Sequence, residues 1–168
     1  MWLPSTTGKS QGDSAMAVAR GAHALVPEQD GLNILVPVRG NTVSRRAAEV
    51  ALALARGSNS AVTALYVLST AGLGGAQRRL KRPGFSRRQE EAVLKDIVEL
   101  ADRHGRPIRT ALRLDVAAED AILRQARLGR YNLIVMGVGR PSGRTLFFGK
   151  VAAAVLENSA CSILFLAS

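Results

Sequence analysis

The feature that most constrains this chain is a regular alternation of short apolar runs with amphipathic segments, which begins at residue 32. Apolar runs rich in β-branched residues predict buried strands, whereas apolar residues at every third or fourth position predict helices. Five strands are expected, at residues 32–38, 61–69, 108–114, 132–138 and 161–167. Four helices are expected between them, at residues 43–56, 86–104, 117–129 and 150–159.

The order of these elements predicts an α/β fold with a doubly wound, five-stranded parallel sheet and helices on both faces. Residues 132–138 are almost wholly apolar, as a central parallel strand should be. Residues 108–114 instead alternate between apolar and basic side chains, which favours an edge strand with one exposed face. The apolar set is Ile108, Thr110, Leu112 and Leu114, and the basic set is Arg109 and Arg113. Ligands of such folds bind beyond the carboxyl ends of the strands, where the winding direction reverses.

Local signals also predict how three of the helices pack, begin or end. A capping box of Ser86 and Gln89 predicts that the second helix begins at Ser86. Asp115 is expected to cap the third helix and Gly129 to end it. In the helix at 43–56 the expected apolar stripe comprises Ala47, Val50, Ala51 and Leu54.

A length of 168 residues corresponds to a single domain, which we expect at residues 31–168 after a flexible N-terminal tail at 1–30. One cysteine, Cys161, and two distant histidines predict neither a disulfide framework nor a metal centre. Cys161 is expected to be an inert buried thiol. No run approaches the roughly 18 apolar residues that span a bilayer, and no secretory signal pattern opens the chain, so we expect a cytoplasmic protein.

The formal net charge of +10 and the excess of arginine, nineteen against four lysines, would suit an anionic partner. The favoured interpretation is a solvated surface with a compositional bias towards arginine, because the cations are scattered. They are densest at residues 78–88, the best candidate for an intermolecular contact. That segment has one aromatic residue, Phe85, which is too little for a stacking platform, so nucleic acid is an unlikely partner.

A glycine-rich segment at 137–149 follows the fourth predicted strand and leads into a helix. Glycines let the backbone approach an anion, and a helix N-terminus offers free N–H groups, so this segment could cradle a phosphate. Taken alone, such a segment favours the alternative of a tight strand-to-helix connection without a ligand, because a lone glycine pattern is a weak signal. Its spacing fits neither the P-loop nor the dinucleotide fingerprint G-x-G-x-x-G.

A different pattern fits: the chain resembles the universal stress protein family. The resemblance covers residues 32–167 and rests on VPV followed by Gly40, the helix SRRAAEVALALA, the strand VTALYVL, the run LIVMG with its glycine loop, and the last strand ILFLA. Nine residues separate Gly139 from Gly149, as in the family's ATP-binding pattern G-x2-G-x9-G-[ST]. The chain looks most like the universal-stress-type C-terminal domain of bacterial cation/proton antiporters.

The resemblance implies a Rossmann-like fold of the adenine-nucleotide alpha-hydrolase-like type and an ATP-like ligand. The nucleotide-binding residues that it implies are Pro37, Val38, Arg39, Met136, Gly137, Gly139, Gly149, Lys150 and Val151. Three departures from the pattern alter the site. Gly137 and Gly139 are one residue too close, Lys150 replaces a phosphate-contacting Ser or Thr, and Arg39 replaces an acidic residue that contacts the nucleoside. The two cations could help to bind ATP, or they could mark a pocket that takes another anion or none.

No nucleophile–base pair, carboxylate dyad or metal cluster emerges, so we expect a non-enzymatic stress-response or signalling module. The alternative is a regulatory domain of a cation/proton antiporter that binds a protein partner and has lost the nucleotide. An ATP-hydrolysing enzyme is a third hypothesis. The resemblance also implies a homodimer through the last strand, whose apolar edge would need cover.

Overall fold

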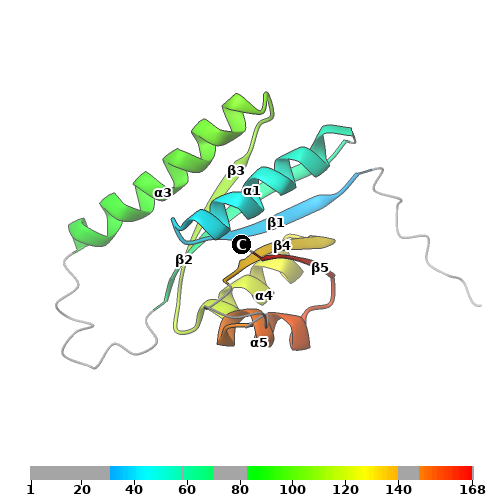
Figure 1. Cartoon of the computed structure of the whole chain (residues 1–168). Helices are drawn as coiled ribbons and strands as arrows, with labels where there is room; N and C mark the ends of the chain where they lie inside the picture. The colour runs from blue at the N-terminus through cyan, green and yellow to red at the C-terminus, as the bar shows by residue number, and fades with distance from the viewer. Residues whose placement is uncertain (1–30, 58, 70–82, 140–147, 168) are drawn as a thin grey trace, which may run out of the picture.

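The computed structural model describes residues 31–57, 59–69, 83–139 and 148–167, and the alternation of strands and helices predicted from the sequence is confirmed (Figure 1). The strands are β1 (Asn33–Val38), β2 (Ala61–Ser69), β3 (Arg109–Asp115), β4 (Leu133–Val138) and β5 (Ser162–Ala167). The helices are α1 (Thr42–Leu54), the 3-10 turn η1 (Ala55–Gly57), α3 (Pro83–Arg103), α4 (Ala118–Leu128) and α5 (Lys150–Asn158).

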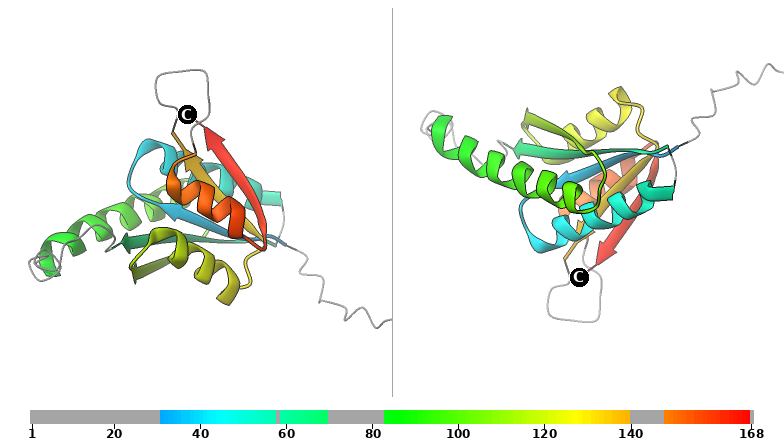
Figure 2. Two further views of the ribbon diagram at one scale, coloured as in Figure 1. Left: turned by 90° about the horizontal axis from the view of Figure 1, so that it is seen from below. Right: turned by 90° about the horizontal axis from the view of Figure 1, so that it is seen from above.

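The five strands form one parallel sheet in the order β3-β2-β1-β4-β5, which confirms the doubly wound fold. Helices α1 and α3 cover one face of the sheet, and α4 and α5 cover the other (Figures 1 and 2). Because β2 and β3 extend the sheet on one side of β1 while β4 and β5 extend it on the other, the winding direction reverses between β1 and β4. None of the described helices combines the length and the apolar character needed to cross a membrane.

The core consists of two layers, one on each face of the sheet. Alanines on α1 let this helix lie close to β1 and β4. The buried residues of α1 are Ser44, Ala47, Ala48, Ala51 and Leu52. Two members of the predicted stripe are therefore wrong, since Val50 is half-buried and Leu54 is exposed. The prediction failed because alanine occurs on several faces of this helix, so the sequence pattern alone does not show which face is buried.

The edge position predicted for residues 108–114 is confirmed, but the apolar face of this strand is largely open. Leu112 is 45% exposed and Leu114 is 70% exposed. Arg113, on the opposite face, donates from Nε to Gln125 Oε1 of α4 at 3.0 Å. Alternation along the sequence therefore identified an edge strand but did not identify which face would be covered.

One predicted helix start and one predicted helix cap are wrong. Helix α3 begins at Pro83 rather than Ser86, because proline has its φ preset for the first helical turn, where its missing N–H costs nothing. Helix α4 has Ala117 at its N-cap, without a side-chain cap. Asp115 instead ends β3, where it accepts a hydrogen bond from the Val116 N–H and pairs with Arg124. The predicted C-cap of α4 at Gly129 is confirmed.

Candidate functional site

The carboxyl ends of β1 and β4 separate at the point where the winding direction reverses. Backbone pairing between these two strands joins Ile34 to Leu133 and Leu35 to Ile134, although both strands continue to their valines at positions 38 and 138. From this point the chain leaves β1 towards α1 on one face, and it reaches α5 on the other (Figure 1). In doubly wound folds ligands bind beyond the carboxyl ends of the strands at such a reversal.

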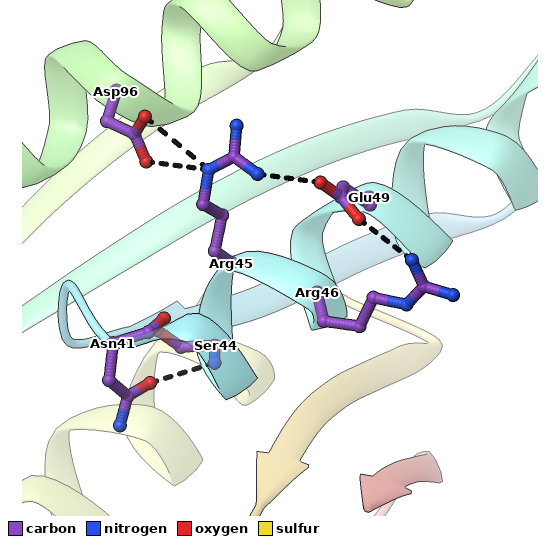
Figure 3. Close-up of polar contacts among 6 residues, drawn as sticks. All are labelled: Asn41, Ser44, Arg45, Arg46, Glu49 and Asp96. Carbon is purple, nitrogen blue, oxygen red and sulfur yellow. Dashed lines mark hydrogen bonds and ion pairs between the residues drawn. The ribbon is translucent and has the colours of Figure 1, made fainter. Parts of the chain in front are cut away.

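The turn from β1 into α1 is held by its own hydrogen bonds (Figure 3). Asn41 caps α1, because its Oδ1 accepts a hydrogen bond from the Ser44 N–H at 2.9 Å. Ser44 Oγ in turn accepts from the Arg39 N–H at 3.2 Å. Gly40 has a φ of +74°, and a Cβ there would lie 2.5 Å from Val93 Cγ2 on α3. The Arg39 backbone is therefore fixed, while its side chain is exposed.

Removing this cap tests how firmly the turn is held. The substitution Asn41→Ala is expected to lower the free energy of unfolding by about 1 kcal/mol, because the Ser44 N–H loses its acceptor. The measurement is urea unfolding of both proteins. Asn41→Asp, which retains an acceptor oxygen, is the control and should stay near the original stability. Equal loss in both variants would contradict a capping role.

The glycines of the predicted site differ in what surrounds them. A Cβ at Gly137 would lie 2.5 Å from the backbone oxygen of Val43 in α1, so the fold itself requires glycine there. A Cβ at Gly139 or at Gly149 would have no described atom within 4 Å. Packing against the described residues therefore does not explain why these two positions are glycine.

The start of α5 combines free backbone donors with a cation. Gly149 is the N-cap and offers no side-chain acceptor, so the first N–H groups of α5 lack an intrahelical partner. The Lys150 side chain is exposed, and its Nζ lies 3.3 Å from Glu119 Oε1 in the first turn of α4. A cation at a helix N-terminus is unfavourable, and the Glu119 carboxylate offsets that cost.

Of the cations near the β1–α1 turn, two are already paired with acids (Figure 3). Arg45 contacts Glu49 at 2.8 Å and Asp96 at 3.2 Å, and Arg46 contacts Glu49 at 3.3 Å. Within the described residues, Arg39 has no ion pair. The guanidinium of Arg39 is therefore the one available to an incoming anion on this turn.

The residues predicted for the site belong to three parts of the fold: the end of β1, the end of β4 and the start of α5. Pro37 is half-buried and Val38 is buried at the end of β1, with exposed Arg39 next in the chain. On β4, Met136 is buried and Gly137 half-buried, and Gly139 follows the strand. On α5, Lys150 is exposed and Val151 packs against the second core layer. The sequence pattern missed the Glu119 carboxylate as a partner of Lys150, because no local signal links α4 to α5.

Three further features of the sequence are the phenylalanines of the glycine-rich segment, the single cysteine and the basic segment. Phe148 packs edge-to-face on Phe165 with ring centroids 4.9 Å apart, while Phe147 lies outside the described residues. Cys161 is half-buried and lines a cavity, so the prediction that its thiol is buried is wrong. Residues 78–82 of the basic segment also lie outside the description. In the described part of the chain, no three His, Cys, Asp or Glu side chains gather as metal ligands would.

Known proteins with similar sequences and structures support this fold. A universal stress protein of Methanocaldococcus jannaschii is 28% identical over 135 residues, which cover 78% of this chain and 79% of that protein. The universal stress protein of Archaeoglobus fulgidus in complex with dAMP superimposes with a TM-score of 0.62 at 19% identity, covering 80% of this chain and 96% of that one. A universal stress protein family member from Arabidopsis thaliana with AMP bound gives a TM-score of 0.57 at 17% identity, covering 81% and 91%.

The family comparison covers most of the chain. The model of the universal stress protein family matches residues 32–166, from the residue before β1 almost to the end of β5. This range contains every described helix, four of the five strands, and all of β5 except its last residue. The chain belongs to the universal stress protein family.

Proposed function

We propose that this protein is a non-enzymatic stress-response or signalling module that binds an adenine nucleotide between the carboxyl ends of β1 and β4. The observation that carries the proposal is a pair of glycines, Gly139 and Gly149, where an added Cβ would meet no described atom, together with the start of α5, which has no side-chain cap. Relatives of the same fold that bind dAMP and AMP support an adenine nucleotide as the ligand.

The phosphates would lie at the start of α5. The free N–H groups of its first turn and the positive end of the helix dipole favour an anion. Lys150 adds a charge at this helix start, and exposed Arg39 adds a second one just after β1. The family pattern has an acidic residue and a hydroxyl residue at these two positions. Here charge-assisted hydrogen bonds from Arg39 and Lys150 to the ligand would replace the contacts that those residues make.

The nucleotide would act by shifting the population of conformations at a surface that contacts a partner. A cytoplasmic homodimer through β5 is the arrangement that we propose. Four consecutive residues of this edge strand, from Ile163 to Leu166, are only half-buried within one chain. An unpaired apolar edge of this kind favours pairing with a second strand.

The ion pair between Lys150 and Glu119 favours a second candidate function. The Glu119 carboxylate lies 3.3 Å from the Lys150 ammonium, so part of the positive charge at the start of α5 is neutralised without a ligand. A site of this kind fits a regulatory domain of a cation/proton antiporter that has lost the nucleotide and binds a protein partner. In that case the protein would remain bound to its partner whether or not nucleotide is present.

The test is mass spectrometry of small molecules released from the purified protein, followed by calorimetric titration with AMP and ATP. We expect an adenine nucleotide in the released fraction and saturable binding in the titration. An empty protein with no saturable binding at millimolar AMP or ATP would overturn the nucleotide proposal and favour the second candidate.

Neutralising Glu119 should strengthen nucleotide binding. In Glu119→Gln, Lys150 loses its internal partner and becomes fully available to phosphate. Since an ion pair with one exposed member is worth about 0.2–1 kcal/mol, the dissociation constant for AMP should fall by a factor of about 1.4 to 5. Glu157→Gln removes the same charge at the other end of α5 and should leave the constant unchanged. Weaker binding in Glu119→Gln would indicate that Glu119 itself contacts the ligand.

A further inference from the structure

A cavity of about 260 Å³ lies between the C-terminal ends of α4 and α5. Its lining includes Tyr131, just before β4, and Cys161, just before β5. The cavity is therefore at the amino ends of the strands, at the opposite edge of the sheet from the candidate nucleotide site. Its volume is below the range of about 300–1,000 Å³ that is usual for drug-sized ligands, so its occupant would be smaller.

The inner wall of this cavity is apolar and firmly packed. Leu123 and Ala126 of α4 are buried and form part of the lining. The Tyr131 ring lies against the end of α4, because a Cβ on Gly129 would be 2.2 Å from Tyr131 Cε2. Gly129 is thus required for the ring to lie where it does, and the ring closes one side of the cavity.

Two arginines, Arg127 and Arg130, lie at the mouth of the same cavity. Both are exposed, and within the described residues neither side chain makes a hydrogen bond or an ion pair. The C-terminal ends of α4 and α5 bring about half a negative charge each to this region. The two full positive charges exceed those two half-charges, so the mouth of the cavity favours an anion.

Arg130 has an unusual backbone conformation for a residue with a side chain. Its φ is +51°, in the left-handed region that favours glycine. The Tyr131 N–H bonds to the Ala126 carbonyl at 3.0 Å and the Arg130 N–H to the Arg127 carbonyl at 3.2 Å, which is the Schellman arrangement at a helix end. Glycine would adopt this backbone conformation with less strain, so the conformation does not explain why residue 130 is an arginine.

We propose that this cavity binds a small carboxylate with an apolar body. The apolar part would contact Leu123, Ala126 and Tyr131, and the carboxylate would lie between the guanidinium groups of Arg127 and Arg130. Arginine presents paired N–H donors that match the two oxygens of a carboxylate. The inference is independent of the nucleotide proposal, since the two sites lie at opposite edges of the sheet.

Cys161 provides a reporter inside the cavity, because it is the only cysteine of the chain. The experiment compares the rates at which anionic iodoacetate and neutral iodoacetamide alkylate Cys161 in the full chain. We expect the ratio of the two rates to exceed that for N-acetylcysteine by about tenfold, because the arginines concentrate anions at the mouth. Hexanoate should protect Cys161 in a saturable manner, whereas hexanol at the same concentration should not.

Substitutions distinguish an effect of these two arginines on the rate ratio from an effect of the overall positive charge of the protein. Arg127→Gln and Arg130→Gly should each lower the rate ratio and weaken protection by hexanoate. Arg109→Gln removes one positive charge on β3, away from the cavity, and should leave both unchanged. Arg130→Gly also relieves the positive φ, so the midpoint of its thermal unfolding should not fall, and loss of structure cannot explain its effect.

Three outcomes would overturn the proposal. A rate ratio equal to that of N-acetylcysteine, without protection by hexanoate, would mean that the cavity does not select anions. If the rate ratio is raised but falls as much in Arg109→Gln as in the two cavity variants, the effect comes from the net charge of the protein. A thiol that neither reagent reaches in the folded protein would mean that the cavity is closed to small molecules.

Discussion

Replacing Gly137 with alanine is expected to lower the free energy of unfolding by about 3 kcal/mol, the largest effect of any single change considered for this protein. The added Cβ would lie 2.5 Å from the backbone oxygen of Val43 and 2.7 Å from its carbonyl carbon. A side chain could move aside by changing rotamer, but a backbone at the start of a helix cannot. The start of α1 and the end of β4 would therefore have to separate.

Urea unfolding monitored by circular dichroism is the measurement for this prediction. Gly139→Ala is the matched control, since a Cβ there meets no described atom within 4 Å and the stability should change by less than about 0.5 kcal/mol. If Gly137→Ala were as stable as Gly139→Ala, the close approach of β4 to α1 would not exist in solution.

Replacing Gly149 with valine is expected to weaken binding of AMP or ATP by about tenfold or more while the protein stays folded. The proposed function requires phosphate to approach the backbone at the start of α5, and a branched side chain at the N-cap would obstruct that approach. Hydrogen bonds to a charged group contribute about 1.5–3 kcal/mol, so losing even one corresponds to this reduction.

Two controls accompany Gly149→Val. One tests whether the variant loses stability, and the other tests whether a valine at a different glycine has the same effect on binding. A Cβ at Gly149 meets no described atom within 4 Å, so unfolding should shift by only about 1 kcal/mol, the usual cost of a poor N-cap. Gly57→Val introduces the same side chain at the end of η1, where space is also open, and should retain the original affinity. Unchanged nucleotide binding in Gly149→Val would place the phosphates away from α5.

Some features of the site could be read from the sequence, because they depend on local patterns. Apolar runs and helical periodicity predicted the order of all five strands and four helices. The same patterns predicted that the glycine-rich segment follows a central strand. Gly137 and Gly139 have the same side chain, however, and the sequence could not separate their roles. Only the position of Val43, distant in the sequence, makes glycine obligatory at 137 and not at 139.

Errors in the predicted elements occurred where tertiary contacts compete with local signals. A local capping signal assigned Asp115 to the start of α4, but Arg124 and the Val116 N–H hold this carboxylate at the end of β3. Alternation assigned one face of β3 to the interior, yet Leu114 is 70% exposed. How far a neighbouring helix extends over a sheet edge is decided by packing between distant segments, which local patterns do not encode.

The sequence by itself determined the class of fold, the family resemblance and the place of the glycine-rich segment, because periodicity and motif spacing are properties of neighbouring residues. Only the tertiary structure decided that β1 and β4 separate beyond Leu35 and that Lys150 meets Glu119. It also decided that Arg127 and Arg130 share a cavity with Cys161. These relations join residues from different helices and strands, and their geometry arises only when the two helical layers pack on the sheet.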